Sequence, residues 1–165
     1  KNLLTRFVDT ELRSQKGLSF VFQHFILTNI YGATENDQRL IPYIIQSSIQ
    51  KEPLSFTAGT QERQYTHIRD VTDFLANNLS VNESGVFNLT ANAVISVREM
   101  IGKVLQVVEE ELGIKTQATF GTADKRDVSM KYLALNTSRL QNCFNFEPQI
   151  SLEQGIKEYI IRWVP

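Results

Sequence analysis

The chain has 165 residues, with 17 Lys and Arg against 18 Asp and Glu and a net charge of −1. A globular domain usually takes ~100 to 200 residues, so we expect residues 1–165 to form one compact unit and exclude a second full domain. The near-neutral charge leaves no global positive field for nucleic acid or an anionic membrane surface, so an anionic ligand must be met by local Arg side chains.

The single cysteine, Cys143, excludes an internal disulfide and a CxxC metal pair. A lone thiol is typical of a reducing cytosol, so we predict a quiet core thiol and a cytoplasmic protein. No apolar run reaches the ~18 residues of a membrane span. Residues 1–6 have neither a signal-peptide core nor an initiator Met. We therefore expect no membrane contact, and a chain that is a piece of a longer protein.

The amino-terminal half begins with an amphipathic pattern. Apolar residues over 3–12 recur at helical spacing, predicting a helix closed by Gly17. No capping residue precedes it, which indicates that its first turns lie upstream of this chain. Residues 18–30 are largely apolar, β-branched or aromatic, so we predict a strand buried on both faces, as in a parallel α/β sheet. The polar run 34–37 ends that strand.

A second helix and a reversal of the chain follow. Apolar residues over 40–49 mark one helical face, and Pro42 belongs in the first turn of that helix. Residues 54–57 and 61–68 have strand composition. Gly59 lies between them and supplies a turn geometry that other residues resist, so we predict a hairpin or a tight reversal there.

The middle of the chain carries two helix-start signals. Asp70 stands where an N-cap belongs, ahead of a helical pattern over 71–79 that we expect to end in the segment 82–85. A short strand over 86–89 follows. Ser96 to Glu99 forms a capping box, in which the serine oxygen and the glutamate each satisfy an orphan backbone N–H.

The remaining elements are short, apart from two helices. The helix that begins at the capping box runs to Gly113. We predict a strand over 115–120, a charged loop over 121–128 and a short helix over 137–142. A second capping box, starting at Ser151, opens a final amphipathic helix that runs through residue 163.

Several catalytic devices are absent from the sequence. His24 and His67 lack the spacing or cysteine company of a metal site, so we interpret both as core or surface histidines and predict no metal. The acidic run 109–111 is interpreted as a solvated helix face. No two of the eight glycines lie closer than eight residues, which excludes a GxGxxG or P-loop cradle. Tyr-x-x-x-Lys, GxSxG and HExxH are also absent.

The block from Thr28 to Asp70 has a more specific pattern. In order it contains Asn29, Tyr31-Gly32, Leu40-Ile41-Pro42 and Gly59-Thr-Gln-Glu-Arg63-Gln-Tyr65. This arrangement resembles the carboxyl-terminal half of the extended short-chain dehydrogenase/reductases that act on nucleotide sugars, namely the NDP-sugar epimerases, 4,6-dehydratases and 4-ketoreductases. Their pattern runs Asn-x-Tyr-Gly-Pro, then x-Ile-Pro, then Gly-x-Gln-x-Arg-Asp-Tyr/Phe.

The resemblance covers essentially the whole chain. Further matching pieces are Val86-Phe-Asn-Leu89, Ser96-Val-Arg-Glu99, Arg126-Asp-Val128, Asn136-Thr-Ser-Arg-Leu140, Phe146-Glu-Pro148 and Ser151-Leu-Glu-Gln-Gly155. The chain departs from the family pattern where Ala33 replaces a frequent proline, Gln64 a frequent aspartate and Ile26 a frequent arginine. The resemblance implies an α/β fold with the last strands of a Rossmann-type parallel sheet, a small carboxyl-terminal substrate-binding lobe, and no GxxGxxG half in this chain.

The resemblance also implies a binding site for an NDP-sugar. The residues carried over are Asn29 for the sugar or diphosphate, Leu40 and Ile41 beside the base, Tyr65 as a wall, and Arg63 and Arg126 on the diphosphate. Arg is suited to that task because its planar fork is permanently charged and matches two oxygens. The alternative for each arginine is a solvated surface charge. For Asp70, a structural cap is preferred over a binding role.

Catalysis and cofactor binding are expected to lie outside this chain. By the resemblance, the parent enzyme uses NAD or NADP, and its glycine loop and Tyr-x-x-x-Lys lie amino-terminal to the matched region. Lys1 falls near the family lysine, but the register is open. The helix over 1–15 resembles the family's dimer helix, which predicts a homodimer, with ordinary packing as the alternative. A hypothesis from another class is a freestanding nucleotide-binding or interaction module without catalysis.

Overall fold

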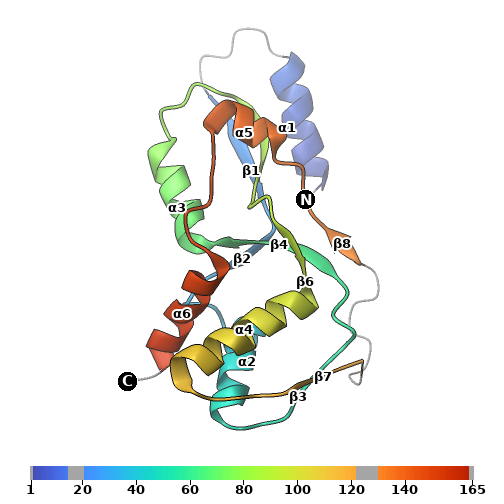
Figure 1. Ribbon diagram of the computed structural model, residues 1–165. Helices are drawn as coiled ribbons and strands as arrows, with labels where there is room; N and C mark the ends of the chain where they lie inside the picture. Colours follow the sequence, from blue (N-terminus) through green and yellow to red (C-terminus); the bar gives the residue numbers. More distant parts are fainter. Residues whose placement is uncertain (1, 15–20, 122–129, 164–165) are drawn as a thin grey trace.

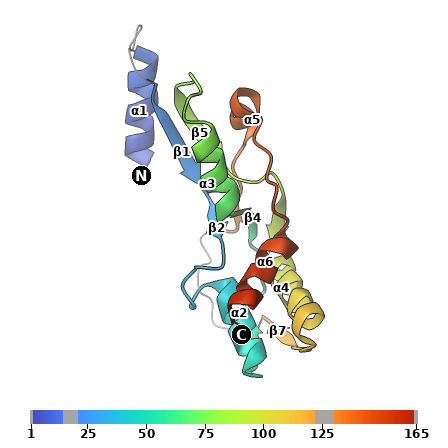
Figure 2. The same cartoon turned by 90° about the vertical axis from the view of Figure 1, so that its left-hand side faces the viewer.

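The computed structural model describes residues 2–14, 21–121 and 130–163. Figures 1 and 2 show an elongated chain in which one end carries the longest parallel strand pair and the other end is mainly helical. The elements in order are α1 (Asn2–Ser14), β1 (Gln23–Leu27), β2 (Asn29–Tyr31), α2 (Leu40–Ile49), β3 (Leu54–Phe56), β4 (Glu62–His67), α3 (Ile68–Asn77), β5 (Gly85–Leu89), β6 (Val94–Ser96), α4 (Val97–Leu112), β7 (Ala118–Phe120), β8 (Tyr132–Leu133), α5 (Ser138–Phe144) and α6 (Leu152–Trp163).

Parallel pairing dominates the strands, as the sequence predicted. β1 pairs with β5, β2 with β4 and β3 with β7, all in parallel. β4 also pairs with β8 in parallel and with β6 in antiparallel orientation. The α/β class is therefore confirmed. Within the described residues, no helix is long and apolar enough to cross a bilayer.

The prediction of one strand over 18–30, buried on both faces, is wrong. The chain forms two short strands that change partner at Thr28, whose hydroxyl lies 2.6 Å from that of Thr90. β1 is only half-buried, and Leu27 is 46 % exposed. The reason is that β1 pairs along one edge only, with β5, within the part of the chain that the structure describes.

Of the two alternatives predicted around Gly59, a hairpin or a tight reversal, the hairpin is wrong. β3 pairs with β7 and β4 with β2, so the two strands that flank the glycine do not pair with each other. Gly59 does adopt the expected left-handed backbone, at φ +68°. Its carbonyl accepts the backbone N–H of Arg98 at 2.9 Å, so this turn fastens the chain to the start of α4.

Both predicted capping boxes are confirmed. At α4, the Ser96 hydroxyl accepts the N–H of Glu99, and the Glu99 carboxylate accepts the N–H of Ser96. Ser151 and Gln154 make the same reciprocal pair before α6. The left-handed Gly113 ends α4, at φ +67°.

The predicted N-cap at Asp70 is wrong, because α3 begins three residues earlier with His67 as its cap. His67 Nδ1 accepts the N–H of Arg69 at 3.3 Å. The Asp70 carboxylate instead accepts the backbone N–H groups of Gln149 and Ile150, at 3.0 and 3.3 Å. Asp70 is therefore structural, as expected, but it joins α3 to the segment that leads into α6. The same helix ends at Asn77, before the predicted segment 82–85.

Two apolar clusters stabilise the chain. The larger one fills the space among α2, α4 and α6 and includes Ile44, Ile101 and Ile156, each fully buried. The smaller one is mainly aromatic and lies among α3, β5 and α5, where the rings of Phe87 and Phe144 meet edge-on at 4.9 Å.

Candidate functional site

Two adjoining hollows open where β2 and β4 meet the start of α2. The first has a volume of about 290 Å³, and the second about 600 Å³. Their linings share four residues: Gln38, Leu40, Arg63 and Val97. The hollows therefore form one continuous groove, with Arg63 among the residues at its junction.

Five of the six predicted binding residues line the first hollow, although they are scattered over 37 positions of sequence: Asn29, Leu40, Ile41, Arg63 and Tyr65. The parallel pairing of β2 with β4 sets Asn29 directly opposite Tyr65. The start of α2 supplies the two aliphatic residues. The sixth, Arg126, lies outside the described residues, so its role stays a prediction.

Arg63 is a half-buried cation held in place by backbone oxygens. Its guanidinium donates to the carbonyl of Glu62 at 2.8 Å and to that of Met130 at 2.7 Å. Among the residues that the structure describes, no carboxylate lies within ion-pair distance of it. Carbonyls orient the side chain without neutralising its charge.

The start of α2 adds a second, weaker source of positive potential. Arg39 occupies the N-cap position, and no side chain caps this helix. Pro42 has no N–H to offer, so the first turn presents the amides of Leu40 and Ile41. Uncapped helix N-termini attract anions because their free N–H groups and the helix dipole act together.

Asn29 has a defined orientation. Its side-chain nitrogen donates to the carbonyl of Gln64 at 3.0 Å. This bond uses one of the two N–H donors of the amide and leaves the amide oxygen as an acceptor. The oxygen can accept a sugar hydroxyl, and the second N–H can donate to a sugar or diphosphate oxygen.

Tyr65 forms the wall between the first hollow and a third cavity of about 430 Å³. Burial raises the pKa of its hydroxyl, so this side chain stays neutral at physiological pH. The third cavity is lined mainly by apolar surface and includes Lys103, His67 and Asp70. The described contacts of these residues are structural. Lys103 forms an ion pair with Glu153, and Asp70 accepts backbone N–H groups ahead of α6.

The loop between β2 and α2 contributes lining residues that no sequence motif had indicated. Glu35, Gln38 and Arg39 all line the first hollow. In the sequence, the polar segment 34–37 indicates only the end of a strand. The signal that could have found them is position, because ligands in α/β folds bind beyond the carboxyl ends of parallel strands.

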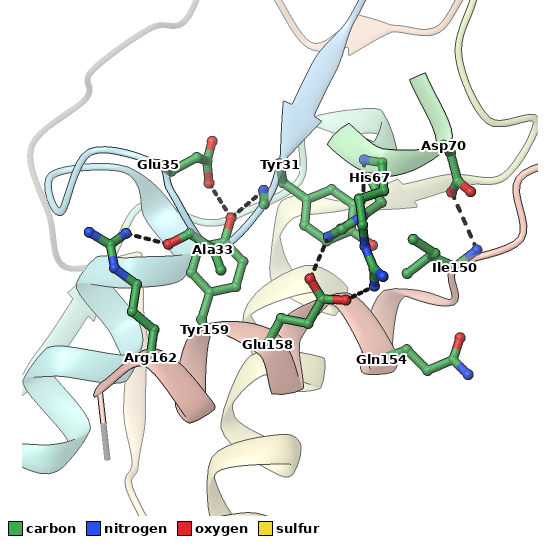
Figure 3. Close-up of polar contacts among 12 residues, drawn as sticks. Tyr31, Ala33, Glu35, His67, Asp70, Ile150, Gln154, Glu158, Tyr159 and Arg162 are labelled. Carbon is green, nitrogen blue, oxygen red and sulfur yellow. Dashed lines mark hydrogen bonds and ion pairs between the residues drawn. The ribbon is translucent and has the colours of Figure 1, made fainter. Parts of the chain in front are cut away.

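Helix α6 holds this loop from behind (Figure 3). The Tyr159 hydroxyl donates to Glu35 Oε2 at 2.5 Å and accepts the N–H of Gly32 at 2.7 Å. Arg162 donates to the carbonyl of Ala33. Burial and the hydrogen bond to Glu35 raise the pKa of Tyr159, so its hydroxyl remains a donor.

His67 is a core histidine, one of the two alternatives that the sequence left open. It is 1 % exposed, its ring meets that of Tyr31 edge-on at 5.2 Å, and its Nε2 lies 3.4 Å from a Glu158 carboxylate oxygen. Burial lowers the pKa of the imidazole. Because Nδ1 accepts the cap bond, the neutral ring carries its proton on Nε2, toward Glu158.

The other candidates from the sequence lie away from the groove. The acidic run 109–111 is exposed and pairs with Lys115 and Lys157, which confirms a solvated face. Cys143 is half-buried against the aromatic cluster. The described ranges contain no group of three or more His, Cys, Asp or Glu that could hold a metal ion.

Most of the chain matches a known protein family. Residues 10–159 match the family model described as GDP-mannose 4,6 dehydratase. The chain belongs to this family. It is thus part of the NAD-dependent epimerases and dehydratases that act on nucleotide sugars, as the sequence pattern predicted.

Curated relatives of this epimerase/dehydratase chain have several activities. It is 22 % identical over 140 residues to a CDP-abequose synthase of Salmonella muenchen, covering 84 % of this chain and 47 % of that protein. It is 26 % identical over 170 residues to a UDP-glucuronate 4-epimerase of Thermodesulfobacterium geofontis, covering 93 % and 51 %. The chain therefore spans about half the length of these relatives.

Solved structures support the same fold. A UDP-glucose 4-epimerase of Thermotoga maritima, solved with UDP-glucose, superposes with a TM-score of 0.80 at 16 % identity, over 100 % of this chain and 53 % of that one. A UDP-glucuronic acid 4-epimerase of Bacillus cereus, solved with UDP-glucuronic acid and NAD, gives 0.71 at 18 % identity, over 96 % and 50 %. The fold of this chain is thus that of about half an epimerase.

Proposed function

We propose that this chain is the carboxyl-terminal, substrate-binding portion of an NAD(P)-dependent nucleotide-sugar epimerase, 4,6-dehydratase or 4-ketoreductase. The observation that carries the proposal is the placement of Arg63, a cation without a described carboxylate partner, at the junction of two adjoining hollows. A nucleotide sugar has the matching layout, with an anionic diphosphate between two uncharged ends. Family membership supports the same ligand class.

The diphosphate is proposed to lie at this junction. Arg63 offers a planar fork that can bind two oxygens at once. The uncapped start of α2 adds N–H donors beside it. Arg126 is proposed to complete the clamp, on the strength of the family pattern alone.

The nucleoside is proposed to occupy the second hollow. Its lining includes the rings of Tyr43 and Phe56, which meet at 6.3 Å and an angle of 84°. Ser55, Thr57 and Gln61 add polar groups that can meet the edge of a base. Leu40 borders the nucleoside from the start of α2, and Ile41, which is 4 % exposed, mainly supports it from the core.

The sugar is proposed to lie in the first hollow, beyond Arg63. The amide oxygen of Asn29 is oriented as an acceptor there, and Tyr65 provides a wall against which a sugar ring can pack. This portion would supply grip and orientation, which bring the reacting carbon to the catalytic groups.

The chemistry itself is assigned to parts of the parent enzyme outside these 165 residues. NAD or NADP accepts and returns hydride in such enzymes, while a tyrosine and a lysine handle the proton. No catalytic residue is proposed in this chain, and the isolated chain should not turn over an NDP-hexose. A cytoplasmic homodimer, paired through α1, remains our expectation for the intact enzyme.

Isothermal titration of the 165-residue chain with UDP, CDP, dTDP and GDP tests the proposal. At least one nucleotide should bind, and Arg63→Ala should weaken it by about 1.5 to 3 kcal/mol because a charge-assisted contact is lost. Arg63→Lys keeps the charge but loses the planar guanidinium fork. Its affinity should therefore lie between those of the unaltered chain and Arg63→Ala. Arg6→Ala, on the exposed side of α1, is the matched control and should change nothing.

Two results would contradict the proposal. If Arg63→Ala binds as the unaltered chain does, the diphosphate does not lie at the junction. If the isolated chain converts an NDP-hexose, the catalytic groups lie within it after all.

A further inference from the structure

We propose that Glu35 makes this site select nucleotide sugars with an uncharged hexose over the corresponding hexuronates. The inference rests on the proposed function and refines its substrate class. The matched relatives leave the class open, because they include a UDP-glucuronate 4-epimerase and a dTDP-glucose 4,6-dehydratase. Family membership therefore leaves the sugar class undecided, and the residues that line the first hollow in this chain bear on it.

Glu35 is placed at the sugar end of the groove. It lines the first hollow together with Asn29 and Tyr31 and has no part in the lining of the second. Its side chain is 18 % exposed, so its carboxylate is largely shielded from bulk solvent. A carboxylate in this lining can accept hydrogen bonds from an uncharged, hydroxyl-bearing part of a ligand.

The carboxylate cannot swing away easily, because α6 fixes it (Figure 3). Tyr159 is fully buried, and its hydroxyl donates to Glu35 Oε2 at 2.5 Å. The same hydroxyl accepts the N–H of Gly32 at 2.7 Å, which fixes the tyrosine in turn. Glu35 Oε2 is thus held from the protein side, and its remaining lone pairs can accept sugar hydroxyls.

Arg39 offsets the charge of Glu35 only in part. Its Nε lies 3.4 Å from Glu35 Oε1, but its side chain is 61 % exposed. Ion pairs of this kind are weak because water screens them. The hollow therefore keeps a negative group at the position where a hexuronate would bring a second one.

The two sugar classes should then behave differently. A hexose offers hydroxyl donors to the Glu35 carboxylate and to the Asn29 amide oxygen. A hexuronate replaces one hydroxymethyl group by a carboxylate, which would face Glu35 in a partly desolvated hollow. Like charges that share a site disfavour each other strongly.

Titration calorimetry with matched sugars tests the inference. The base that binds best as a free nucleoside diphosphate is used for both probes, for example UDP-glucose and UDP-glucuronate. The unaltered chain should prefer the hexose by about tenfold, the size of a one-unit like-charge effect. Glu35→Gln keeps the shape and removes the charge, so the preference should fall below about threefold. Glu52→Gln, an exposed glutamate outside both linings, should leave it unchanged.

Several outcomes would overturn the inference. Equal or tighter hexuronate binding by the unaltered chain would do so, as would an unchanged preference in Glu35→Gln. If Glu35→Gln raises the affinity for the free nucleoside diphosphate and for the nucleotide hexuronate by the same factor, Glu35 borders the diphosphate instead of the sugar. If Arg39→Gln weakens the hexuronate more than the bare diphosphate, Arg39 binds the uronate. Failure of every nucleoside diphosphate to bind would refute the proposed function itself, a distinguishable result.

Discussion

The two ends of the molecule differ in how completely they bury their apolar surface. The helical region, formed by α2, α4 and α6 with β3 and β7, encloses a cluster of 13 buried apolar residues among those described. The sheet region, formed by α1, β1, β5, α3 and α5, has a cluster of six. It also exposes Leu3 and Phe7 of α1, at 83 % and 63 %.

This difference shows where the site gets its rigidity. The loop that carries Glu35 and Arg39 is fastened to α6, and α2 packs into the larger cluster. The groove is therefore built on the better packed region. The sheet region presents apolar surface of the kind that marks contact with other protein surface, which agrees with a chain that spans half of its relatives' length.

The largest expected effect concerns Asp70, which links the two regions. Asp70→Ala would leave the N–H groups of Gln149 and Ile150 without their carboxylate, at a cost of about 3 kcal/mol in the free energy of unfolding. Urea unfolding followed by circular dichroism measures it. Asp73→Ala, exposed on the same helix, is the control and should cost below ~0.5 kcal/mol. Equal losses in the two variants would show that Asp70 is no link.

Gly155 tests the contact between α6 and the strands that carry the site. A Cβ at this position would lie 2.6 Å from the Tyr31 ring and 2.9 Å from the His67 ring. Overpacking of this kind outweighs the helix propensity gained, so Gly155→Ala should lose about 2 kcal/mol of stability in the same assay. Gly102 of α4 has open space around its position, so Gly102→Ala should instead gain about 0.5 to 1 kcal/mol. Gains in both variants would contradict the packing described.

The smallest expected effect is a pH dependence set by His67. Burial holds the pKa of this imidazole below its usual value in the folded chain. The unfolded chain therefore binds the proton more readily, and stability should fall as pH drops below ~6.5 toward the folded pKa. Unfolding free energies measured from pH 7.5 to 5.5 should show this slope, and His67→Gln should flatten it. An identical slope in the variant would assign the effect to other groups.

Local signals predicted much of the fold. The bounds of α2 and both capping boxes follow from short-range hydrogen bonding and periodicity, which a sequence displays directly. The wrong predictions concern features that depend on contacts between residues far apart in the sequence. β1 is half-buried because of how strands pair, and Gly59 turns the chain toward α4 rather than into a hairpin. Asp70 satisfies two N–H groups some 80 residues away, which no local pattern reveals.

The family pattern singled out residues that the structure brings to one groove, and it did not reach the loop between β2 and α2. Asn29, Arg63 and Tyr65 lie on strands that pair in register, so the motif and the groove coincide. The sequence does not indicate Glu35, because the position of its carboxylate depends on Tyr159, a residue 124 positions away. Periodicity explains Tyr159 completely as a core residue of α6, and its hydroxyl function appears only in three dimensions.

Amide chemical-shift mapping tests the central claim most directly. The 165-residue chain, labelled with ¹⁵N, is titrated with the nucleoside diphosphate that binds best. The amide shifts should change mainly at Asn29, Leu40, Ile41 and Arg63, and those of α1 should stay the same. Shifts confined to the third cavity, around Lys103 and Ile150, would place the ligand elsewhere and contradict the account.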